Sequence, residues 1–133
     1  MRYLTVDEVV LIHERILARF GGAGGVRDWG LLRSAVERPR ATFGGEELYP
    51  DLFHKAAALG HSLALNHPFV DGNKRTAWEA MHTMIEENGY ALQAPADEIV
   101  KLMLQIEDKT LGVEEIARWL REHSKPLTQR SES

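Results

Sequence analysis

Residues 51–66 read DLFHKAAALGHSLALN, and this stretch decides the fold class. The positions that recur at helical spacing along one face are Leu52, Ala56, Leu59, Leu63 and Asn66. Alanines and a glycine fill the neighbouring stripe, as expected for a helix that packs on several sides. The sequence therefore predicts a central helix that Pro68 closes.

The rest of the chain is helical in character as well. Thr5 and Glu8 have the spacing of a capping box, and the helix that follows stops at Gly21. Asp28 is placed to cap a short helix that ends before Pro39. Further helices are expected in residues 73–87, 99–110 and 112–123, and residues 40–50, RATFGGEELYP, are expected to form a loop or small hairpin. We predict an all-α fold, a compact bundle of about six helices with a short irregular or hairpin flap.

Length and composition exclude several classes of protein. A chain of 133 residues suits one domain, which we place at residues 1–124, with residues 125–133 as a polar, disordered tail. The 16 basic and 20 acidic residues give a net charge of -4, which offers no overall attraction for nucleic acid or an anionic membrane. The sequence has no cysteine and no apolar run of about 18 residues. We expect a cytoplasmic protein with neither nucleic acid nor membrane as partner.

The charged residues cluster in NHPFVDGNKRTAW, residues 66–78, at the turn between two predicted core helices. The first turn of a helix offers free backbone N–H groups and a positive dipole end, so it can bind a phosphate. Gly72 allows the bend and the close approach of an anion. Asn73 can cap the helix or donate, and Lys74 and Arg75 add positive charge.

Two further residues of this turn suit catalysis. Asp71 is a fitting ligand for Mg²⁺ that also binds phosphate oxygens. His67 can accept a proton from an attacking hydroxyl group, because imidazole titrates near neutral pH. Each residue alone has an ordinary interpretation, as a surface histidine, a turn or solvated cations. Their order together is much less common, and it supplies the parts needed for phosphoryl or nucleotidyl transfer.

Residues 67–75, HPFVDGNKR, closely resemble the signature of the Fic and Doc superfamily, and lysine at the penultimate position resembles the death-on-curing (Doc) branch. The likeness extends over about residues 3–90. The stretches that carry it are YLTVDEVVLIHERIL (3–17), GGVRDWGLLRSAVERPRATFGGEELYP (24–50) and KAAALGHSLALNHPFVDGNKRTAWEAM (55–81).

The resemblance implies a role for most positions of the signature. His67 matches the catalytic histidine that activates the target hydroxyl, and Phe69 matches the aromatic residue that anchors the loop in the core. Asp71 matches the acidic residue that holds Mg²⁺. The positions that match the family's phosphate-binding residues are Gly72, Asn73 and Arg75.

Lys74 separates two possible reactions. In adenylyl-transferring Fic enzymes a glycine at this position leaves room for the outer phosphates of the nucleotide. The resemblance to Doc implies a kinase that transfers the γ-phosphate of ATP to a threonine of elongation factor Tu and blocks translation. Two alternatives remain, namely transfer of AMP to a protein hydroxyl, and a catalytically silent module that binds an antitoxin.

Regulation is expected to come from outside the chain. The resemblance implies a Phd-type antitoxin whose disordered segment folds on binding. TMIEEN, residues 83–88, matches an inhibitory Fic pattern, but Glu87 would lie about three turns from the start of its own helix, so we interpret the match as accidental. The segment FGGEELYP, residues 43–50, corresponds to a flap that helps to dock the target in Fic proteins, and an ordinary surface loop is the alternative.

Other residues that could carry chemistry are expected to be structural. His54 and His61 could share a helix face, but no zinc pattern surrounds them, so we predict that they are not metal ligands. Trp29, Trp78 and Trp119 are expected in the core or between helices.

Overall fold

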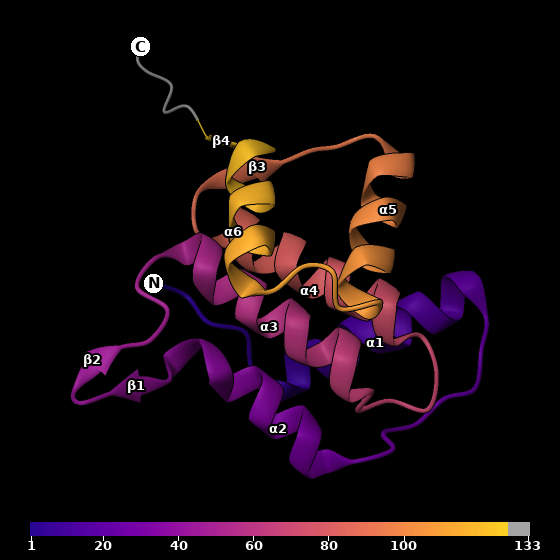
Figure 1. Cartoon of the computed structure of the whole chain (residues 1–133). Helices are drawn as coiled ribbons and strands as arrows, with labels where there is room; N and C mark the ends of the chain where they lie inside the picture. Colours follow the sequence, from indigo (N-terminus) through magenta and orange to yellow (C-terminus); the bar gives the residue numbers. More distant parts are fainter. Residues whose placement is uncertain (128–133) are drawn as a thin grey trace.

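The computed structural model describes residues 1–127. The α-helices of this part are α1 (Val6–Phe20), α2 (Trp29–Glu37), α3 (Leu52–Asn66), α4 (Asn73–Glu87), α5 (Ala96–Glu107) and α6 (Val113–Glu122). The shorter elements are the 3-10 turn η1 (Arg38–Arg40) and the strands β1 (Thr42–Phe43), β2 (Glu46–Glu47), β3 (Tyr90–Leu92) and β4 (Ser124–Pro126). The prediction of a mainly helical fold with a short hairpin is confirmed (Figure 1).

Helix α3 lies at the centre of the bundle and contacts α2, α4, α5 and α6. Leu59 and Leu63 on its predicted apolar face are buried, as are the alanines of the neighbouring stripe. Small side chains on α3 let α4 approach closely, since the sulfur of Met81 packs against the backbone of Gly60. The central position predicted for this helix is therefore confirmed.

Three predicted helix starts are present with their caps. Thr5 and Glu8 form a reciprocal capping box at the start of α1. The Asp28 carboxylate accepts from the backbone N–H of Leu31 at 3.0 Å and caps α2. Asp51 does the same for α3 through the N–H of His54. Each cap fixes the direction in which the chain enters a core helix. The position of α3 in turn fixes where the loop that follows it begins.

The predicted flap is the β1–β2 hairpin, in which Thr42 pairs with Glu47 and Phe43 with Glu46. Lys55 on the first turns of α3 holds its base, because the buried ammonium bonds the Glu47 carboxylate and the Pro39 carbonyl. Phe43 is 82% exposed. The hairpin projects from the bundle beside the start of α3, whereas the charged loop follows the other end of that helix (Figure 1).

The end of the domain differs from the prediction. Ser124–Pro126 form β4, which pairs antiparallel with β3, and the N–H of Leu127 donates to the carbonyl of Gly89 at 2.9 Å. The expected boundary at residue 124 is thus too early, because residues 125 and 126 belong to a small sheet. The sequence predicts a hairpin only in residues 40–50 and does not reveal this second sheet. The remainder of the expected tail, residues 128–133, lies outside the described residues.

Among residues 1–127, no helix has the length and apolar character needed to cross a membrane.

Candidate functional site

The loop between α3 and α4 carries the predicted residues to the first turn of α4. Gly72 is the N-cap of this helix, with φ of 77°, a left-handed conformation that suits glycine. No side chain within the described chain caps α4, and its first backbone hydrogen bond runs from the N–H of Thr76 to the carbonyl of Gly72. The N–H groups of residues 73–75 therefore face outward with the positive end of the helix dipole, as an anion site requires.

His67 ends α3 in a left-handed conformation, with φ of 51° and ψ of 60°. Its side chain is exposed, and it lines the same cleft as the first turn of α4. Arg27 holds the backbone at this point, because its guanidinium donates to the carbonyls of Asn66 and His67 at 2.8 and 2.7 Å. The imidazole is thus presented to solvent in the same cleft as the first turn of α4.

Phe69 anchors the loop in the core, as the family resemblance implied. Its side chain is buried and stacks on His13 of α1, with ring centroids 3.8 Å apart. His13 also bonds the carbonyl of Asp71 through Nε2 at 2.8 Å. The side-chain amide of Asn73 accepts from the N–H of Phe69 and donates to its carbonyl, each at 3.0 Å. Asn73 therefore closes the loop with its side chain and offers an anion only its backbone N–H.

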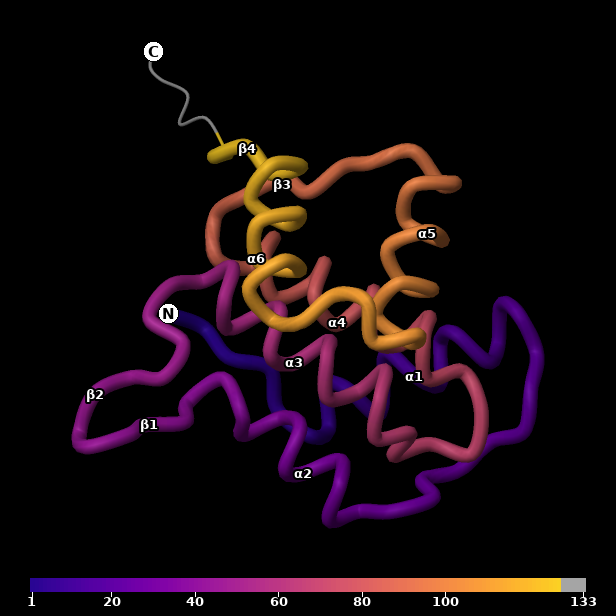
Figure 2. The backbone as a smooth tube through the Cα atoms, viewed as in Figure 1, coloured from indigo at the N-terminus to yellow at the C-terminus, as the bar shows by residue number. Residues whose placement is uncertain are grey.

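The glycine-rich connection between α1 and α2 forms the outer wall of the loop. The N–H groups of Arg27 and Asp28 both donate to the carbonyl of Pro68, and the N–H of Val70 donates to the carbonyl of Gly25. Figure 2 shows this connection on the same side of the molecule as the loop after α3. The backbone of this connection therefore helps to shape the site.

The Asp71 carboxylate is oriented by backbone groups. One oxygen accepts from the N–H of Gly72 at 2.8 Å and the other from the N–H of Ala23 at 3.4 Å. A Cβ at Gly22 would lie 2.8 Å from the carboxylate, so glycine is needed for this approach. Asp71 is exposed and lines the cleft, so its oxygens remain accessible to a cation.

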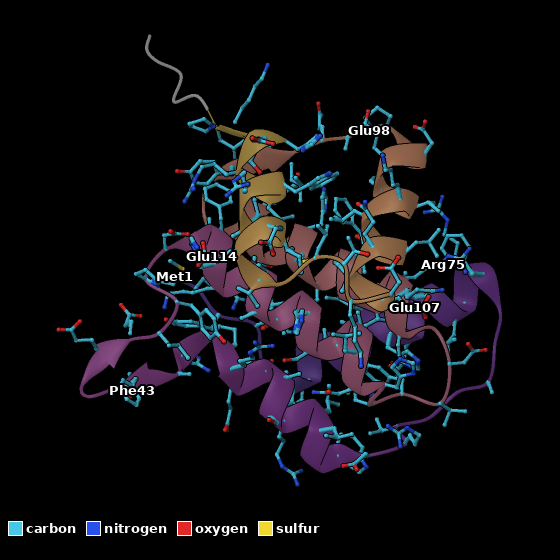
Figure 3. All side chains as sticks on the ribbon, viewed as in Figure 1. Met1, Phe43, Arg75, Glu98, Glu107 and Glu114 are labelled. Atoms are coloured by element: carbon cyan, nitrogen blue, oxygen red, sulfur yellow. The ribbon has the colours of Figure 1, made fainter. Side chains whose placement is uncertain are left out.

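Both predicted cations of α4 contact other side chains. The Lys74 ammonium lies 3.2 Å from the Glu107 carboxylate at the end of α5. The Arg75 guanidinium stacks over the ring of Phe20, at 4.1 Å from its centroid. Figure 3 shows Arg75 and Glu107 at the same end of the bundle. An anion that binds Lys74 has to compete with Glu107, an acidic partner that the sequence did not reveal.

These residues share one cleft of about 1120 Å³ between α1, α4 and α5. It contains His67 and the whole run from Asp71 to Arg75, so the structure brings all six predicted site residues together. Exposed apolar side chains also line it, namely Phe20, Val70, Val100 and Leu104. The cleft therefore combines a charged end with an apolar flank.

The other residues considered in the sequence lie away from the first turn of α4, although Trp78 and Thr83 also line the cleft. Glu87 pairs with Arg2 at the far end of α4, so the TMIEEN match does not reach the anion site. Trp78 and Trp119 pack edge to face with centroids 5.9 Å apart, as expected between helices. Trp29 is 51% exposed, so its expected place in the core or an interface was wrong.

The two histidines of α3 are held by protein groups. His61 accepts at Nδ1 from Arg38 at 2.9 Å, and burial and this cation lower the pKa of His61. His54 lies between the Asp51 and Glu114 carboxylates. Within residues 1–127 no three histidine, aspartate or glutamate side chains are arranged to hold a metal ion.

Fold and site together define a mainly helical domain in which a histidine-containing loop opens onto the N-terminus of a core helix that no side chain of the described residues caps. The model of the Fic/DOC family matches residues 3–85. A protein of Mycolicibacterium smegmatis named Toxin Doc is 49% identical over 100 residues, which are 74% of this chain and 77% of that protein. A protein of Escherichia phage P1 named Protein kinase doc is 33% identical over 89 residues, 67% of this chain and 70% of that protein. The chain belongs to the Fic/DOC family.

Proposed function

We propose that this chain is the toxin of a toxin–antitoxin pair and acts as a protein kinase, transferring the γ-phosphate of ATP to a threonine hydroxyl of elongation factor Tu. One observation carries the proposal: the uncapped N-terminus of α4 and the His67 side chain open into the same cleft. The names of the two relatives, a toxin and a protein kinase, support the same class of activity.

In the proposed reaction each side chain of the site has a chemical role. His67 accepts the proton of the threonine hydroxyl as the oxygen attacks the γ-phosphorus. The bond between this phosphorus and the oxygen that bridges it to the β-phosphate breaks, and ADP leaves. The backbone N–H groups of residues 73–75, Lys74 and Arg75 hold the phosphates and stabilise the charge that develops on them.

Asp71 would hold the Mg²⁺ that accompanies ATP. Its carboxylate oxygens each accept one backbone N–H and keep further lone pairs, which suits a cation that takes one or two carboxylates together with phosphate oxygens. When bound, the ion neutralises phosphate charge. The chain contributes the oriented carboxylate at the edge of the anion site.

The antitoxin is proposed to cover the apolar flank of the cleft. Phe20, Val70, Val100 and Leu104 are each about half exposed there, and a folding amphipathic segment of a Phd-type antitoxin would bury them. The chain without this partner is then expected to be active and toxic.

The decisive experiment mixes the purified chain, Mg²⁺ and elongation factor Tu with ATP labelled at either the α- or the γ-phosphate. Label from the γ-position alone, lost in His67→Ala, is the expected result. The matched control is His82→Ala, which removes a partly exposed histidine of α4 outside the cleft lining and is expected to keep activity.

Other outcomes of this experiment select other functions. Label from the α-position would overturn the kinase assignment and identify an adenylyltransferase. Transfer that is undetectable under all conditions, together with antitoxin binding that His67→Ala leaves unchanged, would identify a silent binding module. In cells, growth arrest by the wild-type chain that is no faster than with His67→Ala would contradict the toxin proposal.

A further inference from the structure

We propose that Arg27 is a positioning residue for the reaction, because its guanidinium fixes the backbone conformation that presents His67 to the cleft. The inference rests on the proposed function of His67 as the base. Arg27 lies forty positions before His67, in the connection between α1 and α2. Its Nε donates to the carbonyl of His67 at 2.7 Å, and its Nη2 donates to the carbonyl of Asn66 at 2.8 Å.

The conformation of His67 needs such support. Proline at position 68 disfavours the right-handed helical region for the residue before it. The extended and left-handed regions therefore remain for the backbone of His67. It adopts the left-handed one, with φ of 51°, although its Cβ makes this region unfavourable. Strained conformations of this kind persist only where the surroundings determine them.

The two hydrogen bonds from Arg27 hold the backbone of His67 in this conformation. The carbonyls of Asn66 and His67 lie on either side of the His67 φ and ψ angles, so their relative direction depends on these two angles. A planar guanidinium has donors at fixed angles and can satisfy both carbonyls only in a narrow range of backbone conformation. It also places a cation at the carbonyl end of α3, where the helix dipole favours positive charge.

The rest of the loop does not depend on this side chain. The carbonyl of Pro68 is bound by the backbone N–H groups of residues 27 and 28, which any substitution except proline preserves. Arg27 is exposed, so its removal leaves no cavity in the core. The chain is therefore expected to fold without the guanidinium, and a specific effect on His67 can be measured.

The kinetic test compares Arg27→Ala and Arg27→Lys with Arg33→Ala, a control that removes an exposed arginine of the adjacent helix α2. In the phosphoryl-transfer assay, kcat of Arg27→Ala is expected to fall about tenfold while KM for ATP changes less than about twofold, since the loss affects orientation and not phosphate binding. Arg27→Lys should not restore kcat, because an ammonium group lacks the two donors at fixed angles that bind both carbonyls. Millimolar guanidinium should partly rescue Arg27→Ala and leave Arg33→Ala unchanged.

A second readout needs no activity. Backbone ¹⁵N relaxation of the free chain is expected to show increased motion at His67 in Arg27→Ala, with the amides of α4 and the midpoint of thermal unfolding close to those of Arg33→Ala. His67 dynamics identical to wild type in Arg27→Ala would overturn the proposal, as would a loss of kcat that only follows a general loss of stability. If the wild-type chain transfers no phosphate, the proposed function fails, and the relaxation data alone decide the role of Arg27.

Discussion

His13 contacts the functional loop at two points. Its ring stacks on Phe69 with an angle of 8° between the planes, and its Nε2 lies 2.8 Å from the carbonyl oxygen of Asp71. Because a carbonyl can only accept, Nε2 carries the proton and donates. The side chain is 2% exposed, and its partly buried hydrogen bond couples α1 to the metal-binding position proposed for Asp71.

Substitutions of His13 should separate the two contacts. His13→Phe keeps an aromatic ring against Phe69 but leaves the Asp71 carbonyl without its donor, which is expected to cost about 1–2 kcal/mol of unfolding free energy. His13→Ala also removes the stacking and leaves a cavity, with an expected cost of about 3–4 kcal/mol. Urea unfolding of the variants provides the measurement. Equal stability of His13→Phe and wild type would contradict the importance of the hydrogen bond.

Single residues could be predicted where the signal was local. The six predicted site residues lie within nine positions of the chain, so a turn between two helices was enough to bring them together. The contributions of Arg27 and Glu107 depend on approaches across 40 and 33 positions, which no spacing rule reveals. His13 did leave a signal, because it falls among the buried residues Val9, Ile12 and Ile16, where a polar side chain needs a partner.

Helices α3 and α6 are joined by a pH-sensitive group. Nδ1 of His54 lies 2.8 Å from the Asp51 carboxylate, and Nε2 lies 3.0 Å from that of Glu114. Burial works to lower the pKa of His54, but the hydrogen bonds that its ring donates to the Glu114 and Asp51 carboxylates outweigh it and raise this pKa above its ordinary value. Arg121 of α6 completes the group through its contact with Asp51 at 3.1 Å.

The raised pKa of His54 gives the sign of a pH effect. The folded chain holds this proton more tightly than the unfolded chain, so the stabilisation is fully present below the unfolded value of about 6.5 and is lost as pH rises through the folded value. Thermal unfolding of wild type and His54→Asn from pH 5 upward measures it. The advantage of wild type should be greatest at the acidic end and shrink above neutral pH, and an advantage that grows with pH would contradict the assignment.

The close contact between α3 and α4 limits the size of the side chain that position 60 can hold. A Cβ on Gly60 would lie 2.2 Å from the sulfur of the fully buried Met81, so Gly60→Ala forces this side chain to move and should cost about 1–3 kcal/mol. In the double variant with Met81→Ala, the methyl group has room, and the combined loss should be smaller than the sum of the single losses. Additive losses in chemical denaturation would contradict the predicted overlap.

At the level of elements, the helices could be predicted and the second sheet could not. Caps and apolar periodicity are local, and they identified the starts of α1 and α2. Strands β3 and β4 have three residues each and show no alternation of buried and exposed positions. They form because α5 and α6 return the chain to Tyr90, a long-range effect that overrides weak local preference.

At the scale of the whole molecule, the β3–β4 sheet is expected to stabilise the helical bundle. A chain that ends after His123 loses the pairing of Ser124–Pro126 with Tyr90–Leu92, whereas a chain that ends after Leu127 keeps it. The shorter chain should lose about 1–2 kcal/mol, as expected for a few partly exposed backbone hydrogen bonds. Urea unfolding of the two chains provides the test, and indistinguishable midpoints would show that β4 contributes nothing to stability.

The three carbonyl groups at residues 66–68 are all bound from the connection between α1 and α2, and this has a consequence for protein engineering. A transplant of residues 66–75 onto another helical hairpin would carry over the histidine, the acid and the two cations. It would leave behind the wall that keeps His67 left-handed and Asp71 aligned. The nine-residue signature is therefore not a portable module, and any graft has to include residues 21–28 as a second, noncontiguous insert.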